Sequence, residues 1–523
     1  MVATDDTARL HAVLAILDDA QRSGLGDMDP ETFRAAGHAV VDLMADYLAG
    51  VEAYPVLPRT TPGELRAMFP SSAPDSPEPL RAIIDDYRRL IEPNVTHWQH
   101  PGFMAYFPST ASGPGILGEM LMSTLVANAM LWRTSPIATE LEQVTVGWLR
   151  EALGLPDSFD GLFTDTASTS TLMALAAARE RATGGAALTG LGDRPRLRVY
   201  ATTETHSSIE KACMTLGIGR EGLRRIAVDA ELAMDADALP RAIAEDRAAG
   251  WLPCAVVATI GTTGSTAIDP VAAIAGITEA EGLWLHVDAA YAGVVALLPD
   301  RRAPFAGWER ADSIVVNPHK WLFTPLDCSL FLTRQMPVLR DAFSLVPEYL
   351  RTLDQAAPVR DFNEYTPQLG RRFRALKIWF ILRYFGLEGI RRRLAAHIEL
   401  AQHVRALVEA EPDAEILAPS PFATVCFRWH PRRFVDRQGD SEAEAALAVL
   451  NERIMEAVNA TGEVFISHTR LGGRLTLRVA LGSIRTEPRH VERAWALIVE
   501  HGRRLAAEAP HAAAARTFDT VGG

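Results

Sequence analysis

The chain has little cysteine, no excess of basic residues and no long apolar run. Its 523 residues include 4 cysteines, none in a CxxC pair, so we expect a reducing cytoplasm and no disulfide framework. The 65 acidic residues outnumber the 52 basic ones and give a net charge of -13, which argues against nucleic acid as a partner. The longest charge-free apolar stretch, residues 120–132, is too short to cross a bilayer, so we expect no membrane association.

The composition is that of an ordinary globular protein, with 48% hydrophobic and 22% charged residues. A chain of this length is expected to form several subdomains. Helical periodicity begins at Asp29 and Pro30, and prolines then recur from position 55 to position 79 and predict an extended arm. We expect five parts: an N-terminal extension (1–27), a helical and extended arm (28–113), a large domain (114–400), a small α+β domain (401–510) and a tail (511–523).

Short apolar segments alternate with helical patterns in the large domain. The expected strands are residues 197–201, 255–260, 283–287, 313–316 and 329–332. This alternation predicts an α/β fold with a mainly parallel central sheet, in which ligand sites lie beyond the carboxyl ends of the strands. The small domain is expected to contain a strand at 424–429, a helix at 441–459, a hairpin at Gly472 and Gly473, and a last helix from 487 to about 504.

Charged side chains follow two of these strands. Lys320 comes just after the strand 313–316, and a lysine in such a place needs an ion-pair partner or a chemical reason. A desolvated lysine has a lowered pKa and, as a free amine, can attack an aldehyde and hold it as a Schiff base. Asp288 ends the strand before it, where a carboxylate can keep a pyridine nitrogen protonated. An aspartate that merely caps a loop is an equally good interpretation of Asp288 alone.

Residues 165–171 form a run rich in hydroxyl groups that leads into a helical pattern. Such a helix start can bind an anion such as phosphate, although an ordinary Ser/Thr cap would account for any one of these residues. His206 follows the strand 197–201 and is placed to lie against an aromatic ring, but a lone histidine there is more often an ordinary loop residue. The sequence has no dinucleotide, P-loop, zincin or hydrolase motif, and no metal site is expected.

Seven sequence segments occur in a fixed order along the chain. Together they characterise a protein family far more specifically than any one of them does. They are THWQHP (96–101), AYFPS (105–109), DTAS (165–168), THSS (205–208), HVDAAYAG (286–293), NPHKWL (317–322) and LGRRFR (369–374). The chain resembles the group II pyridoxal-phosphate-dependent decarboxylases, and within them the aromatic L-amino acid decarboxylase family, over roughly residues 29–504. The resemblance implies the fold type I of aspartate aminotransferase, pyridoxal 5'-phosphate as cofactor, and a homodimer whose active site lies at the subunit interface.

The resemblance also implies a role for individual residues. Lys320 would hold the cofactor covalently, Asp288 would pair with its ring nitrogen, His206 would stack on its ring, and Tyr349 would complete the catalytic group. The residues implied to bind the cofactor are Lys320, Asp288, His206, Ala167, Ser168, Thr263, Ala290, Asn317 and His319. The residues implied to bind the substrate are Trp98, Tyr106, Phe107, Pro108, Met130, Gly370 and Arg478.

Residues 345–369 read as neither helix nor strand and contain three prolines, which suggests a functional loop such as a lid. Tyr349 lies in this stretch and matches a family tyrosine that is thought to help protonate the carbanion after carbon dioxide leaves. Related aldehyde synthases tend to replace this tyrosine or the stacking histidine. Because both residues are retained here, the sequence favours decarboxylation to an amine.

The expected activity is decarboxylation of an L-amino acid to its amine. An aromatic substrate such as tryptophan, tyrosine, phenylalanine or dihydroxyphenylalanine is favoured. Gly102, Met104 and Met130 stand where aromatic-specific relatives often carry aromatic residues, and the flexible methionine also admits aliphatic side chains. An aldehyde synthase, a decarboxylase of aliphatic amino acids and a non-catalytic scaffold of the same fold stay open as alternatives.

Overall fold

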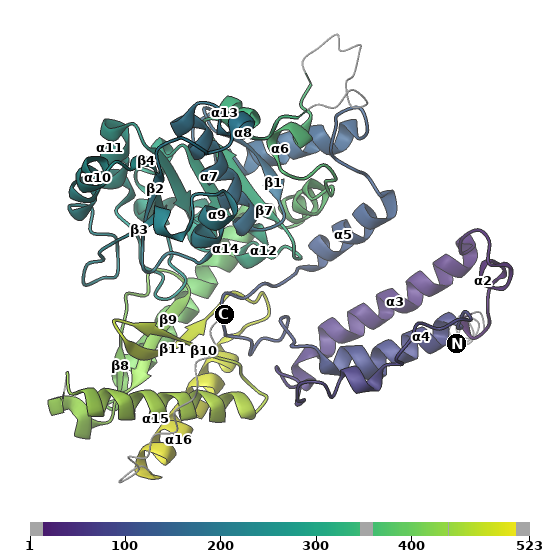
Figure 1. Cartoon of the computed structure of the whole chain (residues 1–523). Helices are drawn as coiled ribbons and strands as arrows, with labels where there is room; N and C mark the ends of the chain where they lie inside the picture. The colour runs from purple at the N-terminus through teal and green to yellow at the C-terminus, as the bar shows by residue number, and fades with distance from the viewer. Residues whose placement is uncertain (1–13, 346–358, 438, 509–523) are drawn as a thin grey trace. The chain divides into compact units, whose positions relative to one another are not determined.

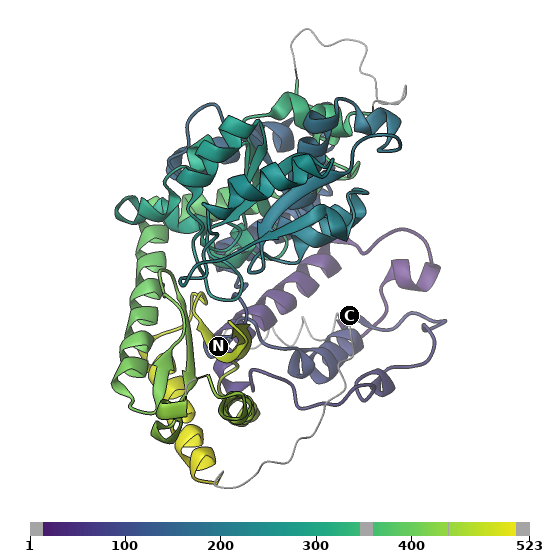
Figure 2. The ribbon, with the colours of Figure 1, turned by 60° about the vertical axis from the view of Figure 1, so that its left-hand side comes forward.

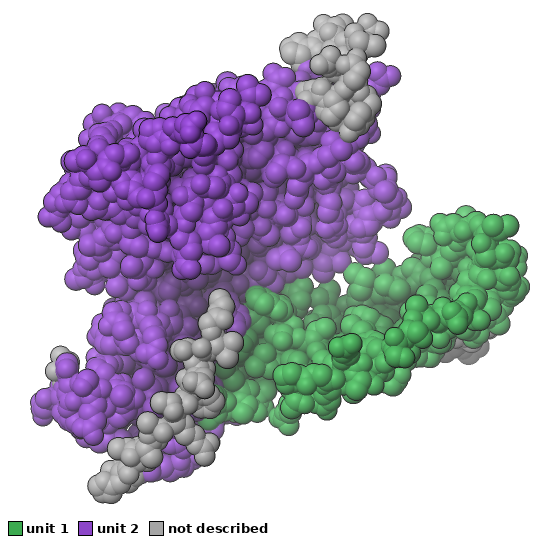
Figure 3. All heavy atoms as spheres, viewed as in Figure 1, with its two compact units in different colours: residues 1–103, 456–465 green, residues 104–455, 466–523 purple. Residues whose placement is uncertain are grey.

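The computed structural model describes residues 14–345, 359–437 and 439–508. The chain separates into two compact units, residues 1–103 with 456–465, and residues 104–455 with 466–523 (Figure 3). The finer division into five parts stays a prediction. Within the described residues, no helix combines the length and the apolar character needed to span a membrane.

The first unit is largely helical. It contains α2 (Asp19–Ser23), α3 (Pro30–Gly50) and α4 (Leu80–Asp86), a π-helical turn (Tyr87–Ile91), and 3-10 turns at Val51–Ala53, Arg66–Met68 and Glu92–Asn94. Helix α3 begins where the sequence predicts. The Asp29 carboxylate accepts hydrogen bonds from the backbone N–H groups of Glu31 and Thr32, both at 3.0 Å, and Pro30 is preorganised for the first helical turn.

A seven-stranded sheet forms the centre of the second unit, in the order β1-β7-β6-β5-β4-β2-β3. Its strands are β1 (Asp160–Thr164), β2 (Leu197–Thr202), β3 (Leu223–Ile226), β4 (Leu252–Thr259), β5 (Trp284–Asp288), β6 (Ser313–Val316) and β7 (Ser329–Thr333). The structure confirms all five strands expected here and adds β1 and β3, which the sequence analysis missed.

The direction of the strands determines where the polar side chains meet. Neighbours from β3 to β6 pair in parallel, whereas β7 is antiparallel to both β6 and β1. Strand β1 therefore runs in the same direction as β6, and only β7 is reversed within this sheet. The carboxyl ends of β1, β2, β4, β5 and β6 consequently lie at one edge, as the mainly parallel sheet predicted.

Helices cover this sheet, and α7 packs against β4 to β7 across one face (Figure 1). The helices are α5 (Gly113–Leu125), α6 (Pro136–Ala152), α7 (Ala167–Thr183), α8 (Ala186–Thr189), α9 (Ser208–Thr215), α10 (Ala238–Ala248), α11 (Val271–Glu281), α12 (Pro318–Trp321), α13 (Met336–Phe343) and α14 (Ala375–Ala410). Short 3-10 helices lie at Arg220–Gly222, Ala292–Leu297, Pro299–Arg301, Ala303–Phe305, Trp308–Arg310, Phe362–Tyr365 and Arg432–Arg437.

Helix α14 leads from the large sheet to a second, antiparallel sheet in the order β10-β11-β9-β8 (Figure 2). These strands are β8 (Ala414–Ile416), β9 (Thr424–Trp429), β10 (Ser467–Leu471) and β11 (Arg474–Ala480), accompanied by α15 (Ser441–Ala460) and α16 (Pro488–Glu508). The predicted strand, hairpin and two helices of this region are confirmed. Gly386 breaks α14 with a φ of 61°, in the left-handed region where glycine carries no Cβ penalty.

Two buried cations hold loops near the large sheet. The guanidinium of Arg371 pairs with Glu142 at 2.6 Å, with exposed side-chain fractions of 2% and 0%, and also donates to the carbonyls of Ala129 and Phe163. Lys377 is completely buried and contacts Glu119 at 2.7 Å and the carbonyl of Pro325 at 3.0 Å. Removing one partner of such a buried pair typically destabilises a protein by about 3–5 kcal/mol, so these contacts fix the segments that they join.

Candidate active site

A cavity of about 190 Å³ lies at the carboxyl edge of the large sheet. Loops that follow β1, β2, β4, β5 and β6 all contribute to it, because their strands end at this edge. Its lining residues are Phe107, Thr166, Ala167, Ser168, His206, Thr259, Gly261, Thr263, Asp288, Ala290, Tyr291, Asn317, His319 and Lys320. All nine residues expected to bind a cofactor are therefore brought together in one cavity.

Lys320 lies on α12, the short helix that begins directly after β6. Burial lowers the pKa of its ammonium group, and the carboxylate of Asp288 opposes that shift only in part. Its Nζ lies 5.3 Å from the centre of the Phe107 ring, over an apolar surface. A lysine in this environment has more free amine available as a nucleophile than an exposed lysine does.

Asp288 is the last residue of β5, and its side chain is buried. One carboxylate oxygen accepts a hydrogen bond of 3.0 Å from the backbone N–H of Ala290. The backbone carbonyl of Asp288 also accepts the N–H of Ile260, at 2.9 Å, which ties β5 to the end of β4. The carboxylate is thus held in place by its own loop while it faces the cavity.

His206 lies between β2 and α9 and lines the same cavity. Desolvation in the cavity is the main cause that lowers the pKa of its imidazole, although the residue as a whole is exposed; Lys320 lowers the pKa further, while Asp288 raises it. The lowered pKa favours the neutral ring. Its Nδ1 lies 2.9 Å from the hydroxyl oxygen of Ser208.

The part of the lining formed by the start of α7, Asn317 and His319 suits an anion. Thr166 caps α7, and Ala167 and Ser168 form its first turn, where backbone N–H groups have no intrahelical partner. His319 accepts the backbone N–H of Cys328 on Nδ1 at 2.9 Å, and burial lowers its pKa to about 4, so the neutral ring carries its proton on Nε2. The buried side-chain amide of Asn317 lies 3.3 Å from Nε2 of His319; because Nε2 is a donor, the amide oxygen is the atom on that side, which turns the amide nitrogen away as a further donor.

A stack of aromatic rings closes one side of the cavity. Phe107 stacks on Tyr291 with ring centres 3.8 Å apart, and Tyr291 stacks in turn on Trp321 at 5.0 Å. Tyr291, Thr166, Thr259 and Gly261 line the cavity but were not among the predicted site residues. Tyr291 directly follows the predicted cofactor residue Ala290 in the sequence segment 286–293. This adjacency is the signal that could have identified it.

Most of the residues predicted to bind the substrate do not line the cavity, in contrast to the residues predicted to bind the cofactor. Only Phe107 lines the cavity, as far as the described chain shows. Arg478 on β11 lies close by, with its guanidinium carbon 5.3 Å from the Phe107 ring centre, and Tyr106 and Pro108 flank Phe107 in sequence. Trp98 belongs to the first compact unit, and Tyr349 lies outside the described residues.

Met130 and Gly370 are brought near each other, but they do not line the cavity of their own chain in the part that is described. The N–H of Ala129 donates to the carbonyl of Arg371 at 2.9 Å. The N–H of Arg371 donates to the side-chain oxygen of Asn128 at 3.0 Å. The two segments therefore form one small surface on the second unit.

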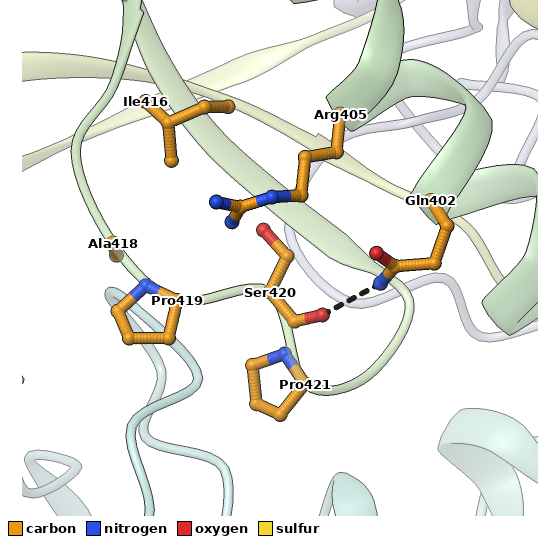
Figure 4. Close-up of a pocket in the computed structure, with 7 residues that line it drawn as sticks. All are labelled: Gln402, Arg405, Ile416, Ala418, Pro419, Ser420 and Pro421. Carbon is orange, nitrogen blue, oxygen red and sulfur yellow. Dashed lines mark hydrogen bonds between the residues drawn. The ribbon is translucent and has the colours of Figure 1, made fainter. Parts of the chain in front are cut away.

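A second hollow, of about 450 Å³, lies between α14 and the loop from β8 to β9 (Figure 4). It is lined by Gln402, Arg405, Ile416, Ala418, Pro419, Ser420 and Pro421. Gln402 donates to the backbone carbonyl of Ser420 at 2.8 Å, and Arg405 is paired with Glu409 at 2.9 Å. None of the predicted site residues that the structure describes lines it, and the cavity at the sheet edge is the candidate active site.

Comparison with known proteins identifies the family. The model of the pyridoxal-dependent decarboxylase conserved domain matches residues 62–430. Phenylacetaldehyde synthase of Arabidopsis thaliana is 40% identical over 92% of this chain and 98% of that protein, and tryptophan decarboxylase 2 of Oryza sativa subsp. japonica is 39% identical over 92% and 96%. The crystal structure of Oryza sativa TDC with PLP and tryptamine matches with a TM-score of 0.87 and 35% identity, over 92% of this chain and 99% of that one. The chain therefore belongs to the pyridoxal-dependent decarboxylase family and has its fold type I architecture.

Proposed function

We propose that this protein decarboxylates an aromatic L-amino acid to the corresponding amine. The observation that carries the proposal is the meeting of Lys320, Asp288 and His206 in one cavity beside an anion-binding helix start. The names of the similar proteins, phenylacetaldehyde synthase and tryptophan decarboxylase 2, refer to aromatic compounds, and this supports an aromatic substrate. A panel assay of amine release over the standard amino acids tests this choice, and release from aliphatic substrates alone would contradict it.

Bound pyridoxal phosphate supplies an electron sink for the pair of electrons left when the substrate's carboxylate departs as carbon dioxide. In our proposal Lys320 holds the cofactor and later releases the amine, and Asp288 keeps the ring nitrogen protonated. The ring of His206 would stack on the cofactor's ring. The first turn of α7, with Thr263, Asn317 and His319, would hold the cofactor's phosphate.

Arg478 is the residue that we propose for the substrate's carboxylate. Its side chain is buried, and Nη1 donates to the hydroxyl of Ser467 at 3.3 Å. Its Nε and Nη2 have no hydrogen-bond partner among the described residues. A buried guanidinium with two open donors matches a carboxylate well. Tyr106, Phe107 and Pro108 would form the wall against the aromatic side chain.

Tyr349 decides between an amine and an aldehyde in this proposal. A Tyr349→Phe variant lacks the hydroxyl that would return a proton to the substrate's α-carbon, so we expect amine release to fall by about a hundredfold or more. Aldehyde, ammonia and hydrogen peroxide should increase, with dissolved dioxygen as the oxidant and water supplying the aldehyde oxygen. Chromatography of amine and aldehyde from the same reaction measures the split.

The matched control is Tyr384→Phe, the same change at a tyrosine that is 73% exposed on α14. It should leave the product ratio unchanged. Unchanged amine output from Tyr349→Phe would remove Tyr349 from the mechanism. Aldehyde as the main product of the unaltered protein would favour the alternative, an aldehyde synthase, a class to which one of the 40% identical relatives belongs.

A homodimer is the assembly that we propose. Met130 and Gly370 do not line the cavity of their own chain among the described residues, and in our proposal they reach the cavity of a second copy. Helix α5 supports such contact, because Leu117, Leu121 and Leu125 form a row with exposed fractions of 51%, 49% and 61%. Large exposed apolar rows of this kind commonly mark protein interfaces.

A Leu121→Glu variant places a charge in this row and should run as a monomer at concentrations where the unaltered chain is a dimer. Light scattering coupled to size-exclusion chromatography measures the mass, and amine release should fall with dimer content. Leu188→Glu, at a residue on α8 that is 90% exposed, is the control and should remain dimeric. A monomeric unaltered protein with full activity would contradict the proposal.

We also propose a cytoplasmic location. All four cysteines, at positions 213, 254, 328 and 426, are buried free thiols. Proteins of reducing compartments commonly keep their thiols in this form.

A further inference from the structure

Within the proposed function, we propose that Ser208 is a positioning residue that keeps the neutral ring of His206 protonated on Nε2. The inference rests on two contacts made by one nitrogen. Nδ1 of His206 lies 3.2 Å from the backbone nitrogen of Ser208 and 2.9 Å from its hydroxyl oxygen. Ser208 is the first residue of α9 and is buried, with an exposed fraction of 3%.

The backbone contact decides the position of the proton. A backbone N–H can only donate, so Nδ1 must present a lone pair toward Ser208. The hydroxyl group can rotate, and it donates to the same lone pair. A neutral imidazole whose Nδ1 accepts hydrogen bonds carries its single proton on Nε2. The helix end strengthens this choice, because the positive end of the α9 dipole disfavours a second proton on the ring.

The charged groups that act on His206 come from three elements. Asp288 at the end of β5 favours the protonated ring, whereas Lys320 on α12 and Lys211 on α9 disfavour it. Burial acts in the same direction as the two lysines. His206 therefore offers a hydrogen-bond donor at Nε2 and no general base at that atom. Acceptor oxygens of a bound substrate are the groups that such an edge can recognise.

The direct test is nitrogen NMR of the holoenzyme labelled with [¹⁵N]histidine, with a His206→Asn variant to assign the resonances. We expect the Nε2–H form at pH 7.5. A ring protonated on Nδ1 or on both nitrogens would overturn the proposal. This readout does not depend on turnover, so it decides the proposal even if the chain were to release no amine.

The kinetic test compares Ser208→Ala with Ser208→Thr. Loss of the hydroxyl removes one hydrogen bond that favours the unprotonated Nδ1, so the pKa of His206 should rise. The acid limb of the kcat profile should then move to higher pH by about 0.5 to 1 unit in Ser208→Ala. Ser208→Thr keeps a hydroxyl and should restore the original profile. An unchanged acid limb in Ser208→Ala, or a shift in both variants, would overturn the role of the hydroxyl.

Discussion

A Lys320→Ala variant should lose amine release by about a thousandfold or more, because no other lysine lines the described cavity. Lys320 combines a lowered pKa with a position close to Asp288, and no neighbouring group can replace its covalent bond to an aldehyde. Amine release with saturating pyridoxal phosphate measures the loss. Borohydride reduction followed by mass spectrometry shows directly which lysine holds the cofactor.

The sequence makes that assignment simple, since Lys211, Lys320 and Lys377 are its three lysines. Reduction of the unaltered protein should leave a phosphopyridoxyl group, the cofactor less one water and plus two hydrogens, on the peptide that contains Lys320. Lys211→Ala is the control and should retain amine release, because Lys211 does not line the cavity. A non-catalytic scaffold would give no trapped cofactor, and a trapped cofactor on Lys211 would contradict the proposed site.

An Asp288→Asn variant should lower kcat by roughly a thousandfold while the cofactor stays attached to Lys320. The amide keeps the size of the side chain but removes the negative charge that would stabilise a proton on the cofactor's ring nitrogen. Turnover and borohydride trapping, measured on the same preparation, separate loss of chemistry from loss of binding.

Asp300→Asn makes the same change at an exposed position and should leave both measurements unchanged. Wild-type turnover by Asp288→Asn would show that the carboxylate has no part in the chemistry. Loss of trapping together with turnover would instead assign Asp288 to cofactor binding.

The predicted strands of the large sheet were those made of apolar residues that are buried on both faces. The sequence analysis missed strand β1 because it contains Gly161, which normally weakens a strand. The structure explains this glycine, since a Cβ there would lie 2.1 Å from the carbonyl oxygen of Phe331 on β7. The sequence analysis also missed strand β3. Arg224 and Arg225 occupy its centre, so it lacks the apolar run of the other strands, and it lies at the edge of the sheet. Close backbone approach and edge position are not visible in a local pattern.

The cofactor side of the cavity was predictable because each polar group follows its own strand, and parallel strands end at one edge. The stack of Phe107, Tyr291 and Trp321 was not, because it joins residues more than 180 positions apart through packing. Met130 and Gly370 illustrate a different limit. A motif shared with a family carries a role over to these two residues, yet neither lines the described cavity of its own chain.

The three lysines occupy three different environments, and this makes the amines of the chain chemically distinguishable. Lys211 is exposed on α9, Lys320 opens into the cavity, and Lys377 is enclosed between Glu119 and Pro325. An acylating reagent should therefore modify the exposed Lys211, reach Lys320 only while the cavity is unoccupied, and leave Lys377 unmodified until the protein unfolds. Protection of Lys320 from the reagent should then increase with the fraction of the protein that holds the cofactor. This measurement needs no substrate.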